Sequence, residues 1–332
     1  LMKIKLQNLD RLYQELQSGL EASVRDVYKS GRHLLGPFTS KLESRIAKLS
    51  QAKHCVMVGS GSDALYYGLV ASATRYDQRI SYPAQTFVAT KNSITRSKNI
   101  PIGADVKPNG LLDWSLVNTD SAVWVGLFGN TEDLPIDKII YEDGAQHFGL
   151  PLRGQFASYS FDPTKALSNF GNAGAVVTND SAIANSVREL RRHGGGVDGV
   201  GGNSIPSERD CAELLVKLDH FPFWQERRQE IARDYHQQLG HLVDCVTQHT
   251  GQVSKFVIGT DQRDQLAKHL LDKKIETKLV YKDPLYNLPG AVKNCKQHLA
   301  LPCDPYMTDE ELQVVILAVK EFFKELPFKR SL

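Results

Sequence analysis

The sequence predicts an α/β protein whose larger part contains a mostly parallel β-sheet. Short apolar segments of strand length alternate with segments in which apolar residues recur at helical spacing, and this alternation is typical of strand–helix–strand units. The alternation restarts after about residue 245, which indicates a small C-terminal α/β unit. We therefore expect a large domain over residues 1–240, with an N-terminal helical arm, and a small C-terminal domain over residues 241–332.

The large domain is expected to begin with a helix over residues 5–30, in which Leu9, Leu12 and Leu16 recur at helical spacing. A loop over residues 30–38 is expected to follow it. Seven apolar segments are then expected to be strands, at residues 54–58, 79–83, 101–105, 122–128, 139–143, 156–161 and 173–179. Helical patterns lie among or after them, at residues 63–72, 87–97 and 181–193.

A glycine-rich segment at residues 193–204 interrupts the pattern and is expected to be a mobile loop. Two separate helices are expected beyond it, at residues 208–221 and 224–239. The C-terminal unit is expected to contain the strands and helices at residues 254–259, 261–273, 276–281 and 309–323.

Composition excludes several classes of protein. A net charge of +2 gives no basis for nucleic-acid binding, which normally needs clustered Lys and Arg. The five cysteines are scattered and form no CxxC pair, so neither a zinc site nor a disulfide framework is expected, and a reducing cytoplasm is the natural compartment. No uninterrupted apolar run could span a bilayer, so we expect no membrane partner.

The segment VMVGSGSDAL, residues 56–65, predicts an anion site. A strand, a turn of small residues and a helix start bring backbone N–H groups and the positive end of a helix dipole to one point, which suits a phosphate. Gly59, Gly61 and Ala64 also fit the loose G-x-G-x-x-A pattern of dinucleotide-binding folds, with Asp77 near the place of a ribose-binding acid. A plain strand–helix turn is the remaining interpretation.

Asp143 ends an apolar strand, and Gln146 follows it by three residues. The carboxyl ends of strands in α/β sheets are where ligands bind, so Asp143 is a candidate ligand contact. The alternative interpretation is a helix cap, because Asp is a favoured N-cap residue.

Lys165 follows the strand FASYSF and its stop at Pro163, and Ser160 lies at the end of that strand. Desolvation disfavours the ammonium form and lowers the pKa of a lysine, which frees the neutral amine to condense with an aldehyde. A surface lysine in a loop is the alternative. A phosphate turn, an acid at a strand end, a serine and a poised lysine together match the needs of pyridoxal 5'-phosphate, in which the acid keeps the pyridine nitrogen protonated.

The sequence resembles the DegT/DnrJ/EryC1/StrS family of sugar aminotransferases, which have the aspartate-aminotransferase fold, fold type I. The resemblance runs in order over nearly the whole chain. Its matching segments are SGRHLLGP, SGSDALYYGL, YPAQTFVATKNSI, EDGAQHFG, SFDPTKALSNFGNAGAVVT, GNSIPSERDCAELLVKL and ALPCDPYMTDEEL.

The resemblance implies catalytic roles for Lys165 and Asp143. Lys165 would form the internal aldimine with pyridoxal 5'-phosphate and later move a proton between the cofactor and the substrate carbon. Asp143 would pair with the pyridine nitrogen, Gln146 would contact the ring hydroxyl, and Phe87 would stack on the ring face.

The resemblance also implies how the cofactor phosphate is held. Ser160 and the turn with Gly61, Ser62 and Asp63 would bind it within one subunit. Asn203 would reach the phosphate of a neighbouring subunit, because the family builds its sites across a homodimer interface.

Three positions depart from the family pattern where its members approach the substrate: Gly126 and Val280 replace histidines, and Ile205 replaces an arginine. The leading hypothesis is transfer of an amino group to a keto sugar, with ping-pong kinetics. The resemblance implies that the sugar is nucleotide-linked and that L-glutamate is the donor. Alternatives are a non-sugar ketone or amino acid as substrate, an NAD-dependent oxidoreductase built on Gly59 and Gly61, and a non-catalytic regulatory protein that binds the cofactor.

Overall fold

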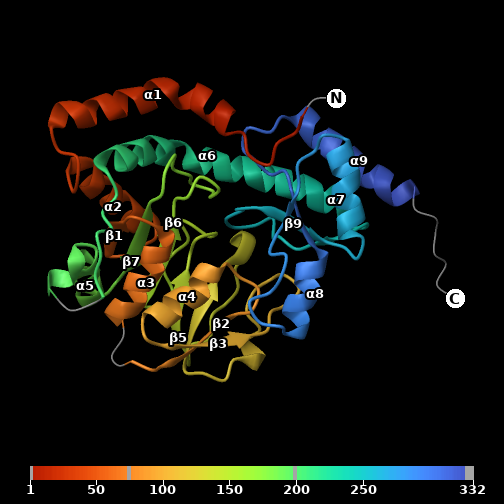
Figure 1. Cartoon of the computed structure of the whole chain (residues 1–332). Helices are drawn as coiled ribbons and strands as arrows, with labels where there is room; N and C mark the ends of the chain where they lie inside the picture. The colour runs from red at the N-terminus through yellow and green to blue at the C-terminus, as the bar shows by residue number, and fades with distance from the viewer. Residues whose placement is uncertain (1–2, 73–75, 197–199, 326–332) are drawn as a thin grey trace.

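The computed structural model describes residues 3–72, 76–196 and 200–325. Its larger sheet has the strand order β1-β7-β6-β5-β4-β2-β3 (Figure 1). Neighbouring strands from β3 to β6 are parallel, and β7 alone is antiparallel to both of its neighbours. The strands are β1 His54–Val58, β2 Arg79–Pro83, β3 Ile100–Ala104, β4 Ser121–Val125, β5 Ile139–Asp143, β6 Phe156–Ser160 and β7 Gly174–Thr178. The predicted mostly parallel sheet is confirmed.

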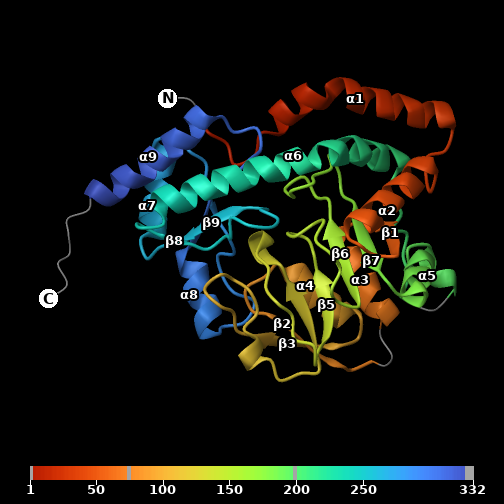
Figure 2. The same ribbon diagram turned by 180° about the vertical axis from the view of Figure 1, so that it is seen from behind.

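Helices cover both faces of this sheet, because alternate strand residues point to opposite faces. Val56 and Val58 of β1 pack into a core with α3 and α5, whereas Cys55 and Met57 pack into a second core with α1, α2 and α6. Figure 1 and Figure 2 show α1 lying along α6 above the sheet. The bounds are α1 Leu9–Ser30, α2 Pro37–Leu49, α3 Gly61–Ser72, α4 Val88–Arg96, α5 Ser181–Leu190 and α6 Glu208–Leu239.

The C-terminal part contains a smaller antiparallel sheet of order β10-β11-β9-β8. Its core includes Ile258, Leu299 and Leu312, together with the C-terminal end of α6. The elements are β8 Asp244–Cys245, β9 Phe256–Gly259, α7 Arg263–Asp272, β10 Lys278–Leu279, α8 Pro289–Gln297, β11 His298–Leu301 and α9 Asp309–Glu325. The domain boundary at residue 240 stays a prediction, although α6 ends at Leu239.

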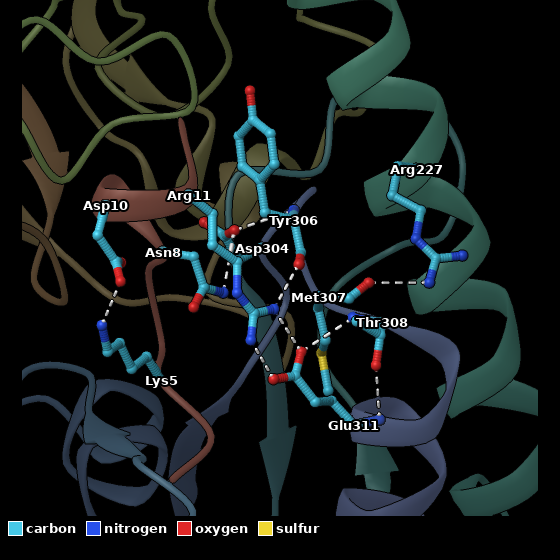
Figure 3. Close-up of polar contacts among 10 residues, drawn as sticks. All are labelled: Lys5, Asn8, Asp10, Arg11, Arg227, Asp304, Tyr306, Met307, Thr308 and Glu311. Atoms are coloured by element: carbon cyan, nitrogen blue, oxygen red, sulfur yellow. Dashed lines mark hydrogen bonds and ion pairs between the residues drawn. The ribbon is translucent and has the colours of Figure 1, made fainter. Parts of the chain in front are cut away.

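The N-terminal segment lies against this C-terminal part before α1 begins. Ile4 pairs with Ile275 in an isolated bridge, and Asn8 donates to Asp304 at 3.3 Å. Arg11 makes a bidentate ion pair with the buried Glu311, with N–O distances of 2.8 and 2.6 Å (Figure 3). Charge-assisted bidentate pairs are the strong class of hydrogen bond, so this contact fixes the start of the arm.

The prediction of two helices at 208–221 and 224–239 is wrong, because α6 is one helix of 32 residues with Pro222 inside it. A proline removes one helical hydrogen bond and normally kinks or ends a helix. Phe221 and Trp224, on either side of Pro222, are both buried in the core against the large sheet. Tertiary packing of the helix face outweighs the local cost.

Two helices were not predicted, α2 and α8, and each begins with a proline, Pro37 and Pro289. Proline is favoured at the first position of a helix, because its missing N–H is not needed there. The strands β8 and β11 were missed as well, and several predicted elements are shorter than expected. Helix 5–30 begins at Leu9, strand 122–128 ends at Val125, and strand 276–281 is reduced to Lys278–Leu279.

The expected mobile loop at 193–204 lies partly outside the described residues, which omit 197–199. Its described ends pair with each other: His193 donates its N–H to the carbonyl of Gly202, and Gly202 donates to Leu190. Across residues 3–72, 76–196 and 200–325, no helix combines the length and apolar character needed to cross a membrane.

Candidate active site

A cavity of about 480 Å³ lies at the carboxyl ends of β4, β5 and β6 and beside the start of α3. Parallel strands bring their carboxyl ends to one edge of the sheet, which is the usual ligand site of such folds. The predicted site residues that line it are Gly61, Ser62, Phe87, Asp143, Gln146, Ser160 and Lys165. Gly61 and Lys165 lie far apart in the sequence, yet both line this one cavity. The sequence pattern predicts that they come together.

The turn from β1 into α3 approaches β6 closely. A Cβ atom on Gly61 would lie 2.4 Å from Cβ of Ser160, so only glycine fits there. Gly61 and Ser62 are the first residues of α3, where backbone N–H groups have no acceptor within the helix. These N–H groups and the Ser160 hydroxyl make this corner of the cavity suited to a phosphate.

Two predicted phosphate contacts lie elsewhere. The Asp63 carboxylate accepts a hydrogen bond from Ser204 Oγ at 2.7 Å and lies 3.9 Å from Arg96, outside the cavity lining. Its backbone N–H donates to Ser60 Oγ at 3.1 Å. Asn203 is exposed, pairs with Arg192 in an isolated bridge and does not line the cavity of its own chain. Its expected role across a subunit interface stays a prediction.

Asp143 is 8% exposed and is held as a hydrogen-bond acceptor. Thr90 donates its hydroxyl to Oδ2 at 2.8 Å, and the Ala145 N–H donates to Oδ1 at 3.3 Å. The second contact closes a local turn, and residues 144–155 contain no helix. The helix-cap interpretation of Asp143 is therefore wrong, and the carboxylate lines the cavity. A buried carboxylate held in this way can accept a hydrogen bond from a protonated ring nitrogen.

Gln146 is fixed by two residues from distant segments. The Phe128 N–H donates to Oε1 at 3.0 Å, and Nε2 donates to the Tyr281 hydroxyl at 3.0 Å. Because a backbone N–H can only donate, the Phe128 N–H determines which end of the Gln146 amide is the oxygen. Phe128 and Tyr281 have φ values of 64° and 59°, in the left-handed region that costs non-glycine residues energy. Such strain is typical of functional sites.

Lys165 lies in the turn after β6, where its backbone N–H donates to the Asp162 carbonyl at 2.9 Å. Burial lowers the pKa of Lys165 below its usual range, and the nearby charge of Lys278 lowers it further, against the opposing effects of Asp143 and Asp162. A lowered pKa makes the neutral amine more available as a nucleophile and as a base. Lys165 is half-buried and lines the cavity, so it is not a lysine of an exposed surface loop.

Two further lysines line the cavity and were missed from the sequence, Lys255 and Lys278. Burial, and then the charges of Lys165 and Lys278, lower the pKa of Lys255 to about 7. Its ammonium donates to the Thr164 carbonyl at 3.4 Å. Both lysines come from the C-terminal part of the chain, and no local pattern marks them as ligands.

Gly126 has a structural reason to be glycine in this chain. A Cβ atom there would lie 2.2 Å from Nδ1 of His147, whose buried ring packs 4.8 Å from the Trp124 ring. The His147 ring also lies 3.6 Å from a Glu142 oxygen. Of the other two positions that depart from the family pattern, Val280 lines the cavity, whereas Ile205 does not.

The residues that line the cavity have the chemistry that pyridoxal 5'-phosphate requires. Lys165 offers an amine for the aldehyde, Asp143 an acceptor for the ring nitrogen, and the turn at Gly61 and Ser62 donors for the phosphate. Within the described part of the chain, no group of three or more His, Cys, Asp or Glu could hold a metal ion.

The fold is similar to that of a solved aminotransferase. The structure of DesV from S. venezuelae in complex with a ketimine intermediate matches with a TM-score of 0.90 and 27% sequence identity, covering 98% of this chain and 100% of that chain. The fold and the lysine-bearing cavity therefore define a fold type I aminotransferase that depends on pyridoxal 5'-phosphate. More narrowly, the chain belongs to the DegT/DnrJ/EryC1/StrS aminotransferase family, which it matches over residues 14–320.

Two curated relatives match over almost their whole length. The erythromycin biosynthesis sensory transduction protein EryC1 of Saccharopolyspora erythraea is 31% identical, over 96% of this chain and 99% of its own. A dTDP-3-amino-3,4,6-trideoxy-alpha-D-glucose transaminase of Streptomyces venezuelae is 29% identical, over 96% of both chains. The oxidoreductase interpretation of the Gly59 and Gly61 turn is wrong, and Asp77 is exposed and outside the cavity lining.

Proposed function

We propose that the protein transfers an amino group to a keto sugar, that the sugar is nucleotide-linked, and that L-glutamate is the amino donor. Two observations support the substrate class. One is the similarity to a transaminase whose name specifies a dTDP-linked amino sugar. The other is a cavity of about 480 Å³ at the sheet edge, which leaves room beside the cofactor site for a further ligand.

The observation that carries the proposal is that Lys165, with its lowered pKa, faces the same cavity as the buried Asp143. Lys165 would bind the cofactor aldehyde and, once released, would accept and return a proton at the substrate carbon. Asp143, held by Thr90, would keep the ring nitrogen protonated. When bound, pyridoxal 5'-phosphate supplies the electron sink for the carbanion.

The test measures amine transfer by the purified holoenzyme from L-glutamate to dTDP-linked keto sugars and, separately, to simple keto acids. We expect turnover with keto sugars and ping-pong kinetics. Turnover with keto acids alone would favour the alternative, a non-sugar ketone or amino acid as substrate. Reduction of the holoenzyme with borohydride, followed by peptide mass spectrometry, should place the cofactor on Lys165.

Variants test the assigned roles. Lys165→Ala should reduce turnover by at least about 10³-fold, and Asp143→Asn by about 10²-fold or more. Lys41→Ala removes an exposed lysine and should leave turnover unchanged. If Lys165→Ala retained turnover, the catalytic role assigned to Lys165 would be refuted. If the unmodified protein bound the cofactor but showed no turnover, the alternative of a regulatory protein would be favoured.

We also propose that the active species is a cytoplasmic homodimer. The support within this chain is that Asn203 is exposed and does not line its own chain's cavity. Sedimentation of the holoenzyme tests the dimer. Asn203→Ala should weaken cofactor binding if the dimer completes the site, and unchanged cofactor affinity would contradict that role.

A further inference from the structure

A second cavity opens beside Lys165. It has a volume of about 150 Å³ and shares Thr164, Lys165, Lys255 and Lys278 with the active-site cavity, so the two are adjacent at the proposed catalytic lysine. Its other walls come from the N-terminal segment, α6 and the end of β11. We call this space the lysine-side recess.

Arg228 of α6 lines the recess and is only 7% exposed. Its Nε and one of its terminal nitrogens have no hydrogen-bond partner among the described residues. Buried polar groups in proteins are normally paired, and a buried charge without a partner is expensive. An unpaired buried guanidinium therefore indicates a missing anion.

The acid that lines the recess does not pair with Arg228. Asp304 also lines the recess, but its Oδ1 accepts from Asn8 Nδ2 at 3.3 Å and from the Tyr306 N–H at 3.0 Å (Figure 3). No described carboxylate comes within ion-pair distance of Arg228, whereas the neighbouring Arg227 pairs with both Glu230 and Asp309.

A second unpaired donor lines the same recess. Ser254 is 9% exposed, lines the recess, and its hydroxyl has no partner among the described residues. Lys255 follows it directly in the chain and reaches both cavities. The recess thus combines a planar guanidinium, a hydroxyl and an ammonium, which together suit the two oxygens of a carboxylate.

We infer that the lysine-side recess binds a carboxylate group of the amino donor. The inference rests on the proposed aminotransferase function, because a donor's amine must reach the position of the Lys165 amine. A carboxylate one or a few bonds from that amine would then enter the adjacent recess. The recess is too small for a nucleotide-linked sugar, so donor and acceptor sugar would share the cofactor but not this space.

The experiment uses the holoenzyme and the unreactive dicarboxylate glutarate as probe. Binding is measured by calorimetry, and the donor half-reaction is followed by absorbance at increasing L-glutamate concentration. Arg228→Met should weaken binding of both ligands by about 10- to 100-fold, and the KM for the keto sugar should change by less than about 3-fold. Arg227→Met is the matched control on the same helix and should leave all three values unchanged.

Three further variants keep the test decisive. Lys255→Met and Ser254→Ala should also weaken glutarate binding, and they answer the question if Arg228→Met does not fold. Arg228→Lys should restore part of the affinity, because it keeps the charge but not the bidentate fork. Comparison of L-glutamate with 4-aminobutyrate and 2-aminobutyrate shows which carboxylate of the donor depends on Arg228.

Wild-type affinity for glutarate and L-glutamate in the Arg228→Met, Lys255→Met and Ser254→Ala variants would overturn the inference. An equal loss of affinity for donor and keto sugar would overturn it too, since that result indicates general damage to the site. If no keto sugar is aminated but glutarate binding still depends on Arg228, the proposed sugar substrate fails and the carboxylate site stands.

Discussion

Replacement of Lys255 by methionine should make the cofactor-free protein more stable. The lysine is partly buried, with a pKa of about 7 instead of its ordinary 10.5. The unfolded chain therefore binds a proton between pH 7 and 10.5 that the folded protein does not. Stability must rise with pH across that window. At 1.36 kcal/mol for each pH unit, the fall in pKa from 10.5 to about 7 corresponds to about 5 kcal/mol at most. About 4 kcal/mol of this penalty is present at pH 7, where the folded lysine is half protonated.

Because solvent still reaches part of the side chain, we expect Lys255→Met to raise the free energy of unfolding by about 2 kcal/mol at pH 7. The gain should shrink toward pH 10, where the wild type has lost the penalty. Urea denaturation of the cofactor-free proteins at pH 7 and pH 9.5 measures both values, with the exposed Lys41→Met as control. A loss of stability, or a gain that does not change with pH, would refute the reasoning.

The remaining predictions concern packing and the N-terminal arm. Gly126→Ala should lower the free energy of unfolding by about 1–3 kcal/mol, because the added carbon would lie 2.2 Å from His147. Combining His147→Ala with Gly126→Ala should recover part of the lost stability, because it removes the ring that the new Cβ would meet. If the losses in unfolding free energy of the two single variants simply added in the double variant, this contact would be contradicted. Glu311→Gln should cost about 1–3 kcal/mol through its ion pair with Arg11. The hydrogen bond from Arg11 lowers the pKa of Glu311, so the wild type should lose this contribution as pH falls through that pKa, and the variant should not. Parallel stability–pH curves of the two proteins would argue against the pair.

The part of the site that could be predicted from sequence is the part formed by adjacent strands. Asp143 and Ser160 end neighbouring parallel strands, and Lys165 follows the second of them. Strand periodicity and the rule that carboxyl ends share one edge are enough to bring them together. The glycine turn at Gly61 could be added because a strand–turn–helix pattern has its own local signal.

The rest of the site depends on tertiary contacts between distant segments. Arg228, Lys255 and Tyr281 come from a helix, a loop end and a strained turn, and nothing in their local sequence distinguishes them from surface residues. That Arg228 is buried without a hydrogen-bond partner for two of its nitrogens can be seen only in the folded structure. The helices at Pro37 and Pro289 are a different case, because a proline at the first helical position was a readable signal.

The unbroken course of α6 past Pro222 affects how the two substrates could take turns. Arg228 is carried by the same continuous helix whose earlier residues, such as Cys211, pack against the large sheet. Its guanidinium should therefore keep a constant distance from the cofactor when the surrounding segments shift. Exchange of the keto acid product for an incoming keto sugar would then depend on movement of the other segments that line the recess, which contribute Gln7 and Asp304. Arg228 would stay in place during this exchange.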